Sequence, residues 1–299
     1  MIYTLTFNPA IDYIVNVDNI QFGKTNRSKN EEIYIGGKGI NVSIVLKNLG
    51  VDSKCLGFYG GFVGKEIIRI LDDFGCKSDF IEVEQNSRIN IKIKSNEETE
   101  LNAQGPTISN ENIEKLFLKL ETLKDNDILV LAGSIPNTIP SNIYQKIQEK
   151  LKDKNIKIVV DATKDLLINS LKYKPFLIKP NKDELNEIFN VEIETDEQLI
   201  FYAKELKKLG AKNIIVSLGK DGAFLLDEND VIYKSKAPKG TLINSVGAGD
   251  SMVAGFIYGF EKFNNYEKAF KYSVATGSAT AFSYWLAKKD LVEKLFETL

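Results

Sequence analysis

The sequence contains no histidine among its 299 residues. This absence excludes Ser-His-Asp and Cys-His nucleophilic chemistry and most zinc sites, which leaves carboxylates, lysines, arginines and backbone amides for any catalysis. Cysteine is scarce as well, because Cys55 and Cys76 are too few for a disulfide framework and lack metal-ligand spacing. We expect both to be buried thiols in a reducing cytoplasm.

An excess of charge and long apolar runs are also missing. The chain has 39 basic and 41 acidic residues, a net charge of −2, and no basic run or tail. It therefore lacks the electrostatic footprint of a nucleic-acid or membrane-surface protein. No stretch reaches the roughly 18 uninterrupted apolar residues of a membrane helix, and residues 1–9 alternate like a strand rather than a signal peptide. We expect a cytoplasmic protein with a small-molecule partner.

Most of the sequence repeats one pattern, a short apolar strand followed by an amphipathic helical stretch. Examples of such strands are residues 127–134, 157–161, 176–181 and 213–219. Strands that are apolar on both faces and alternate with helices predict an α/β fold, a doubly wound and mainly parallel sheet. Ligands of such folds bind beyond the carboxyl ends of the strands. The polar residues at these ends are Ser134, Asp161, Asn181, Ser217 and Gly219.

Two excursions, at approximately residues 11–35 and 86–104, break this pattern. They alternate apolar and polar residues with period two and have no helix between their strands, which predicts a small half-exposed sheet. We expect the two excursions to lie together as a lid over the site, although an ordinary hairpin extension would show the same alternation. An apolar face on such a lid could also form a homodimer contact.

The segment 244–252, Asn-Ser-Val-Gly-Ala-Gly-Asp-Ser-Met, carries the chemistry. Gly247 and Gly249 allow the backbone to aim successive N–H groups at one point, and an apolar helix continues from Met252. A helix start beside a glycine turn is a site for a phosphate. Asp250 could accept a proton from an attacking hydroxyl, and the helix dipole should keep it ionised and weakly basic. An ordinary helix N-cap at Asp250 explains the same residues equally well.

A second glycine-rich loop occupies residues 36–42, Gly-Gly-Lys-Gly-Ile-Asn-Val, at the start of a predicted helix. It is not a Walker loop, because neither Ser nor Thr follows Lys38. The other loop is not a dinucleotide-binding motif, because Met252 stands where the third glycine should be.

The two loops are similar to the signature motifs of the ribokinase and phosphofructokinase-B family of sugar kinases, in that family's order and spacing. Other segments resemble the branch of the family that acts on phosphorylated ketohexoses. These segments are residues 6–12, 26–27, 87–92, 132–136 and 179–185. The resemblance covers essentially the whole chain. It implies a single ribokinase-like domain over 1–299, with three αβα layers and a small β-sheet lid.

The resemblance also implies a set of substrate-binding residues. They are Asp12, Gly37, Lys38, Asn41, Arg88 and Ser134. Asp12 would accept hydrogen bonds from sugar hydroxyls, and Lys38 with Arg88 would hold the phosphate already on the sugar, because a dianion needs cationic partners. Taken alone, Arg88 would more simply be a solvated residue of the lid.

The remaining implied residues concern ATP and Mg²⁺. Asn181 and Glu184 match an Asn-x-x-Glu motif that organises Mg²⁺ and its waters around the nucleotide phosphates, although Glu184 alone would be an ordinary helix-face carboxylate. The residues implied to border ATP are Asn181, Ser217, Gly219, Gly222, Gly247 and Gly249. The residues implied in catalysis are Gly247, Ala248, Gly249 and Asp250, with Asp250 as the general base.

Residues 57–64 and 97–106 resemble the members of the family that phosphorylate fructose 1-phosphate to fructose 1,6-bisphosphate. Ala103 and Gln104 depart from the usual pattern of that branch, and Asn244 stands where many relatives have Ser or Thr. Tagatose 6-phosphate is the alternative substrate. A sensor that binds a sugar phosphate without catalysis is the alternative from another class, but it would need neither a base nor a metal organiser.

Overall fold

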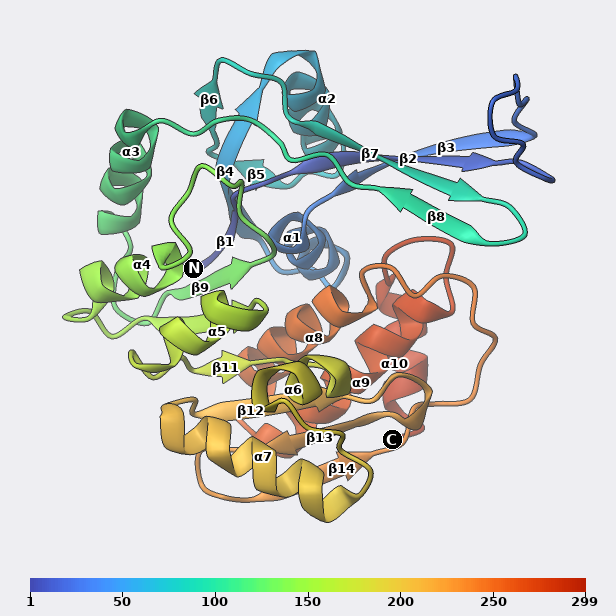
Figure 1. Cartoon of the computed structure of the whole chain (residues 1–299). Helices are drawn as coiled ribbons and strands as arrows, with labels where there is room; N and C mark the ends of the chain where they lie inside the picture. The colour runs from blue at the N-terminus through green and yellow to red at the C-terminus, as the bar shows by residue number, and fades with distance from the viewer.

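The computed structural model describes residues 1–299 and has a central, mostly parallel sheet (Figure 1). Along the sheet the strands follow the order β14-β13-β12-β11-β10-β9-β1-β4-β5, and β6 pairs with β4. The only antiparallel pairs are β12–β13 and β13–β14. The strands are β1 (Ile2–Thr6), β4 (Ser53–Gly60), β5 (Lys77–Ser78), β6 (Ile81–Val83), β9 (Ile128–Ala132), β10 (Lys157–Asp161), β11 (Leu177–Ile178), β12 (Asn213–Ser217), β13 (Ala223–Leu226) and β14 (Ile232–Ser235).

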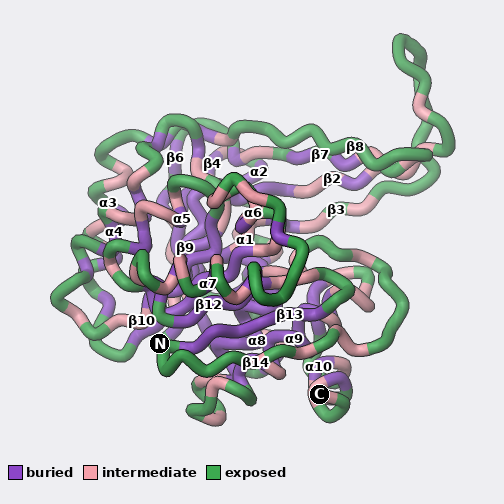
Figure 2. The backbone as a smooth tube through the Cα atoms, turned by 60° about the horizontal axis from the view of Figure 1, so that its bottom comes forward, coloured by how far each residue is buried: buried purple, intermediate pink, exposed green.

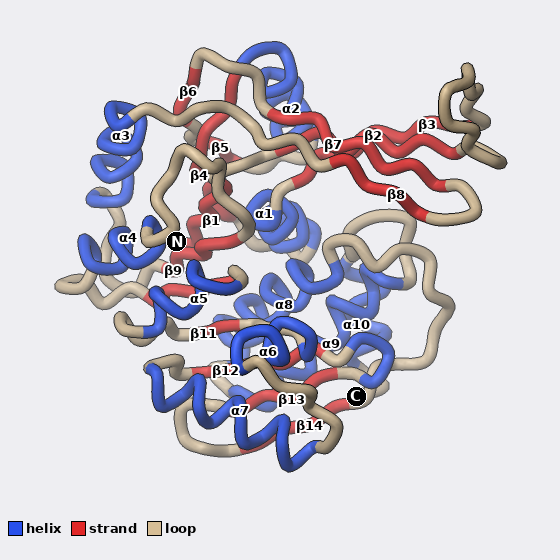
Figure 3. Tube along the Cα trace, viewed as in Figure 1, coloured by secondary structure: helices blue, strands red, loops and turns tan.

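Helices cover both faces of this sheet, so the fold has the three layers that the sequence predicts (Figure 3). One face packs against α1 (Lys38–Asn48), α2 (Gly61–Asp73), α8 (Ala248–Phe263), α9 (Tyr266–Ala281) and α10 (Lys289–Phe296). The other face packs against α3 (Asn110–Glu121), α4 (Ile143–Leu151), α5 (Lys164–Leu171), α6 (Lys182–Phe189) and α7 (Asp196–Leu209). None of the helices has the length and apolar character needed to span a bilayer.

Strand β9 shows why the sheet is sandwiched in this way. All five of its residues are buried, and they alternate between the two hydrophobic clusters, with Ile128 and Val130 in one and Leu129 and Leu131 in the other. Figure 2 shows the same burial along the strands of the interior. A strand with two buried faces can lie only between two helical layers. One prediction was too long: the strand expected over 176–181 is only two residues, because Pro180 has no N–H for the ladder.

A separate four-stranded sheet, which we call the lid sheet, projects from one side of the molecule (Figure 1). Its order is β3-β2-β7-β8, with β2 (Ala10–Asn16), β3 (Asn30–Gly36), β7 (Arg88–Lys94) and β8 (Glu98–Leu101). Strands β2 and β7 pair in parallel from Ala10 opposite Arg88 to Asn16 opposite Lys94. This pairing unites the two excursions, so they are not independent hairpins.

Candidate active site

Two adjoining cavities lie beyond the carboxyl ends of the central strands. The smaller has a volume of about 540 Å³ and extends to the lid sheet, and the larger, of about 1140 Å³, lies over β12, α8 and α9. Asn181, Ser217 and Gly249 line both cavities and mark where they join. This is the edge at which doubly wound folds bind their ligands.

The structure brings the residues predicted from the sequence together around these cavities. The smaller cavity is lined by Asp12, Gly37, Lys38, Asn41, Arg88, Ser134, Glu184, Gly247 and Asp250. The larger cavity is lined by Gly219, Gly222 and Ala248. The residues implied to bind sugar therefore line the smaller cavity. Those implied to bind nucleotide are divided: Gly219 and Gly222 line the larger cavity, Gly247 lines the smaller one, and the other three line both.

Asp250 lies in the first turn of α8 and is almost fully buried. The helix begins at Ala248, earlier than the expected Met252, and Gly247 is its N-cap, with a left-handed φ of 77°. The carboxylate of Asp250 makes no capping hydrogen bond and instead accepts one from Asn41 Nδ2 at 2.7 Å. The alternative explanation of Asp250 as an N-cap is therefore wrong, and its side chain is available to the cavity.

The environment of Asp250 makes it a stronger base than the helix position suggests. Burial raises the pKa of Asp250 to about 6, while Lys38 acts in the opposite direction and Asp161 adds to the rise. The expectation that the helix dipole would leave Asp250 weakly basic is therefore wrong, because desolvation of the carboxylate outweighs it. A base with a pKa just below neutral pH is ionised yet able to take a proton.

Two further residues complete the charged cluster: Asp161, which the sequence offered only as a polar residue at a strand end, and Lys179, to which no role was assigned. The Asp161 carboxylate is buried at the end of β10, with Lys38 Nζ at 3.2 Å and Lys179 Nζ at 3.4 Å. Burial alone would raise the pKa of Asp161, but Lys179 and Lys38 together lower it. Asp161 also raises the pKa of Lys38, so this lysine stays charged. The position of Asp161 at a strand end indicated the site, but nothing in the sequence paired it with the lysines.

Because residue 249 is glycine, the ammonium group of Lys179 can lie close to the start of α8. A Cβ atom on Gly249 would lie 3.0 Å from Lys179 Nζ, so a side chain there would displace the ammonium group. The free N–H groups of the helix start and the two lysines together form a strongly anion-attracting site. A phosphoryl group at the junction of the cavities would meet all of them.

The sugar side of the smaller cavity is built on the lid sheet. Asn90 Nδ2 donates a hydrogen bond to Asp12 Oδ1 at 2.8 Å, which fixes the carboxylate across β2 and β7. Four buried oxygens of residues that line this cavity, Thr6 Oγ1, Asn8 Oδ1, Asn90 Oδ1 and Asp161 Oδ1, have no hydrogen-bond partner. Buried acceptors without partners are rare and costly in proteins. These oxygens are closed off from solvent in this structure, so a donor could reach them only after the surrounding side chains move.

Comparison with known proteins identifies the family. The sequence model described as "pfkB family carbohydrate kinase" matches residues 5–287. The chain belongs to this family. A 1-phosphofructokinase from Bacillus subtilis is 47% identical over 99% of this chain and 97% of its own length. A D-tagatose-1-phosphate kinase from Bacillus licheniformis is 38% identical over 100% of this chain and 97% of its own length.

The solved structures of the family share this fold. The tetrameric inhibited form of phosphofructokinase-2 from Escherichia coli superposes with a TM-score of 0.92 at 25% identity, over 99% of this chain and 98% of that one. The chain is thus a carbohydrate kinase with a ribokinase-like fold, as the sequence motifs predicted.

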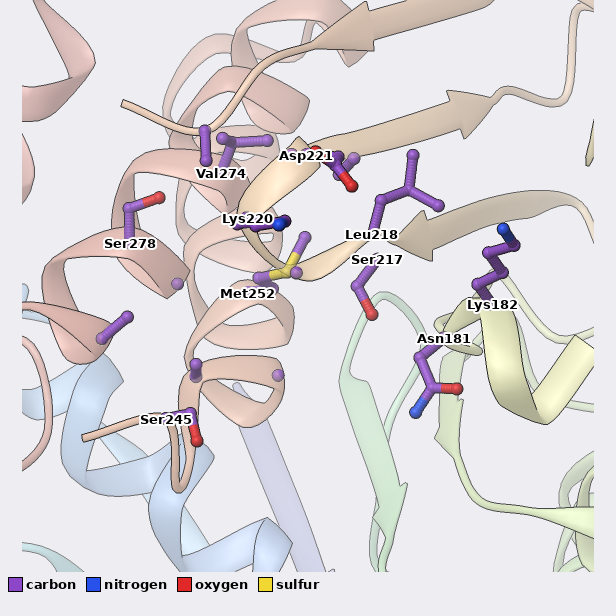
Figure 4. A pocket seen from close by; sticks show the side chains of 18 of the residues that line it. Asn181, Lys182, Ser217, Leu218, Lys220, Asp221, Ser245, Met252, Val274 and Ser278 are labelled. Atoms are coloured by element: carbon purple, nitrogen blue, oxygen red, sulfur yellow. The ribbon is translucent and has the colours of Figure 1, made fainter. Parts of the chain in front are cut away.

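For a carbohydrate kinase the larger cavity has the composition of a nucleotide site. In Figure 4, Met252, Val274 and Ser278 of α8 and α9 lie across the cavity from Asn181 and Ser217. The apolar residues Leu218, Met252 and Val274 line it together with Gly219 and Gly222. The lining is mixed: its apolar residues could pack against a purine base, and polar and charged residues surround them.

The Asn-x-x-Glu motif also has a structural role that the sequence left unrecognised. Asn181 Oδ1 accepts a hydrogen bond from the Glu184 N–H at 2.7 Å, and Glu184 Oε2 accepts one from the Asn181 N–H at 2.8 Å. This is a capping box at the start of α6. Because the capping box occupies only Oε2, Oε1 of Glu184 remains available. The chain has no group of three or more acidic, His or Cys side chains that could hold a metal alone.

Proposed function

We propose that this carbohydrate kinase transfers the γ-phosphoryl group of ATP to the 6-hydroxyl of fructose 1-phosphate, giving fructose 1,6-bisphosphate and ADP. The observation that carries this proposal is Asp250, a buried base at the junction of a polar cavity and a nucleotide-like cavity, surrounded by lysines. The 47% identity with a 1-phosphofructokinase over nearly the whole chain supports the choice of sugar.

In this proposal Asp250 accepts the proton of the attacking hydroxyl. The N–H groups of Gly247 and Gly249 at the start of α8 bind the transferring phosphoryl group, since that of Ala248 already donates to Ser245 O at 3.2 Å, and Lys179 balances its negative charge. The position of Lys38 beside Asp161 favours the same task for it, rather than the role with the existing phosphate that the sequence implied. Most of the rate acceleration in phosphoryl transfer comes from this kind of positioning and charge stabilisation.

Mg²⁺ fits the donors that the chain offers. Asn181 and Glu184 would hold it through water, since Mg²⁺ keeps several waters and shares phosphate oxygens rather than entering a full protein cage. When bound it would neutralise charge on the nucleotide phosphates. Ser217, Gly219 and Gly222 would border the ATP itself. A cytoplasmic location accords with the free, buried thiols of Cys55 and Cys76.

The choice of sugar is tested by ADP release from ATP-Mg with each candidate offered separately. We expect the highest kcat/KM for fructose 1-phosphate, above tagatose 1-phosphate, tagatose 6-phosphate and fructose 6-phosphate. Tagatose 1-phosphate differs from fructose 1-phosphate only at C4, and the D-tagatose-1-phosphate kinase relative makes it the second candidate. A preference for a 6-phosphate would overturn the proposed orientation of the sugar, whereas a preference for tagatose 1-phosphate would change only the epimer.

The pH dependence of turnover follows from the raised pKa of Asp250. Because its carboxyl must be ionised to act as a base, we expect kcat/KM to rise through about pH 6 and level off near neutrality. The second ionisation of a sugar phosphate falls in the same range. The control is therefore the affinity of Asp250→Asn for fructose 1-phosphate, measured by calorimetry across the same pH range. Because this variant lacks the Asp250 carboxyl, its binding profile reports the ionisation of the substrate without that of Asp250. Profiles of identical shape would contradict a titrating Asp250.

We also propose that the lid sheet pairs with a second copy of the chain. Four apolar residues form one row across its four strands: Tyr13 lies opposite Ile33 and Ile91, and Ile91 lies opposite Leu101. Ile33 and Leu101 are 57% and 56% exposed. A continuous apolar row on a thin sheet favours association with an identical surface. The inhibited form of phosphofructokinase-2 from E. coli is tetrameric.

The dimer is tested by placing a charge in this row. Ile33→Asp should convert the dimer to a monomer at micromolar concentration in sedimentation velocity, because the interface would bury an unpaired carboxylate. Leu118→Asp on α3, whose leucine is 63% exposed, is the matched control and should leave the dimer intact. A monomeric wild-type protein would contradict the proposal.

A further inference from the structure

Strand β7 presents two cations to the smaller cavity, of which the sequence motifs assigned only Arg88. Arg88, Asn90 and Lys92 alternate along the strand and all line that cavity. Ile89 and Ile91, on the opposite face, are each 37% exposed. The alternation therefore places Lys92 on the ligand-facing side of the lid sheet.

Lys92 is unusually buried for a lysine, with only 9% of its side chain exposed. Its ammonium lies 3.0 Å from Glu100 Oε1 on the neighbouring strand β8, and the Glu100 side chain is 42% exposed. Glu100 also accepts a hydrogen bond from Asn102 Nδ2 at 3.2 Å. A buried ammonium group needs an anionic partner, and the partner of Lys92 is Glu100, which lies at the solvent-exposed edge. Water can therefore solvate the Glu100 carboxylate if it leaves Lys92.

Arg88 has no such partner. Its guanidinium donates only to two backbone carbonyls, Asn8 O at 3.1 Å and Ala103 O at 3.3 Å, and it forms no ion pair. Burial lowers the pKa of Arg88, while the Asp12 carboxylate, which lines the same cavity, acts in the opposite direction. The two cations therefore border the segment 100–103 from opposite ends. Their Cα atoms are about 13 Å apart along the strand, a gap that two long side chains and one phosphate can fill.

We propose, on the basis of the function proposed above, that Lys92 and Arg88 together bind the phosphate already carried by the sugar, and that Lys92 exchanges Glu100 for this phosphate. Glu100 is then a competitor that neutralises Lys92 in the empty site and turns to solvent when the sugar phosphate binds. Lys92 is accordingly a specificity-determining residue that selects phosphorylated over unphosphorylated ketohexoses. This assignment leaves Lys38 free for the transferring group.

The exchange predicts opposite effects for the two partners of one ion pair. Lys92→Met should raise the KM for fructose 1-phosphate about 10- to 100-fold, the range for losing a charge-assisted hydrogen bond, with kcat and the KM for ATP nearly unchanged. The KM for unphosphorylated fructose should not change. Glu100→Gln should lower the KM for fructose 1-phosphate about 2- to 5-fold, because the half-exposed Glu100 carboxylate no longer competes with the phosphate for Lys92. Lys94→Met, on the same strand face but outside this cavity, is the control and should behave as wild type.

A merely structural ion pair gives a different result, because removing either partner would then weaken binding. Raised KM values in both Lys92→Met and Glu100→Gln, or no change in either, would overturn the inference. Binding of fructose 1-phosphate measured by calorimetry without ATP separates this result from the proposed reaction. A wild-type protein that binds the sugar phosphate through Lys92 but releases no ADP overturns the reaction alone. A wild-type protein that turns over normally while Lys92→Met binds normally overturns the inference alone.

Discussion

Asp250→Asn should lower kcat by about 10²- to 10⁴-fold, the usual contribution of general base catalysis, with little change in the dissociation constant of fructose 1-phosphate. The asparagine has the same shape as the aspartate, and its amide oxygen can still accept the hydrogen bond that Asn41 Nδ2 donates at 2.7 Å. The variant therefore loses the proton acceptor but retains the packing at the start of α8. Steady-state ADP release and calorimetric binding measure the two quantities separately.

Asp290→Asn is the matched control, since it also removes a carboxylate from the first turn of a helix, α10, far from the cavities. It should leave kcat unchanged. The same experiment decides between catalysis and sensing. A protein that only senses a sugar phosphate would release no ADP as wild type and would bind the sugar equally well after the substitution. A loss of both binding and turnover in Asp250→Asn would instead show that the residue supports the site structurally.

The layers of the fold are predictable from the sequence because burial leaves a strong pattern. Strands such as Ile128–Ala132 are apolar at every position, which requires helices on both sides. The period-two alternation of the excursions indicates a sheet with one solvent-exposed face. The pairing of β2 with β7 was less accessible. Its two strands are separated by more than seventy residues. Parallel strands are not joined by a tight hairpin turn, so no turn motif in the sequence predicts the pair.

Site residues were predictable where a reactive side chain lies in a recognisable local backbone motif. They were missed where the role of a charged side chain depends on residues that only the tertiary fold brings near it. Gly247 and Asp250 are typical of a phosphate loop at a helix start, but the burial that makes Asp250 basic arises from tertiary packing. Lys179 and Lys92 look like solvated lysines in a lysine-rich sequence, yet both are buried. The pair Asn181 and Glu184 shows the reverse: a motif predicted for metal binding is also a capping box.

After Asp250→Asn, the substitution expected to have the largest effect is Asp161→Asn, which should lower the free energy of unfolding as well as turnover. Its carboxylate is 1% exposed and lies between two ammonium groups, so the variant leaves Lys38 and Lys179 close together without an anion. Breaking a buried ion pair by removing one partner costs about 3 kcal/mol or more of unfolding free energy. Because the Lys38 side chain is 36% exposed, water screens part of the repulsion, and we expect about 3 kcal/mol in urea denaturation at neutral pH.

If both lysines face the transferring phosphoryl group, ATP-Mg supplies the missing anion in this variant. The increase in melting temperature on adding saturating ATP-Mg should therefore be larger for Asp161→Asn than for wild type. Asp127→Asn provides the comparison, because Asp127 is a buried carboxylate paired with the N-terminal amine at 2.9 Å and lies outside both cavities. It should lose stability without any added response to nucleotide. Equal responses of the two variants would mean that Lys38 and Lys179 do not contact the phosphates, and the phosphoryl site would then have to be assigned to the start of α8 alone.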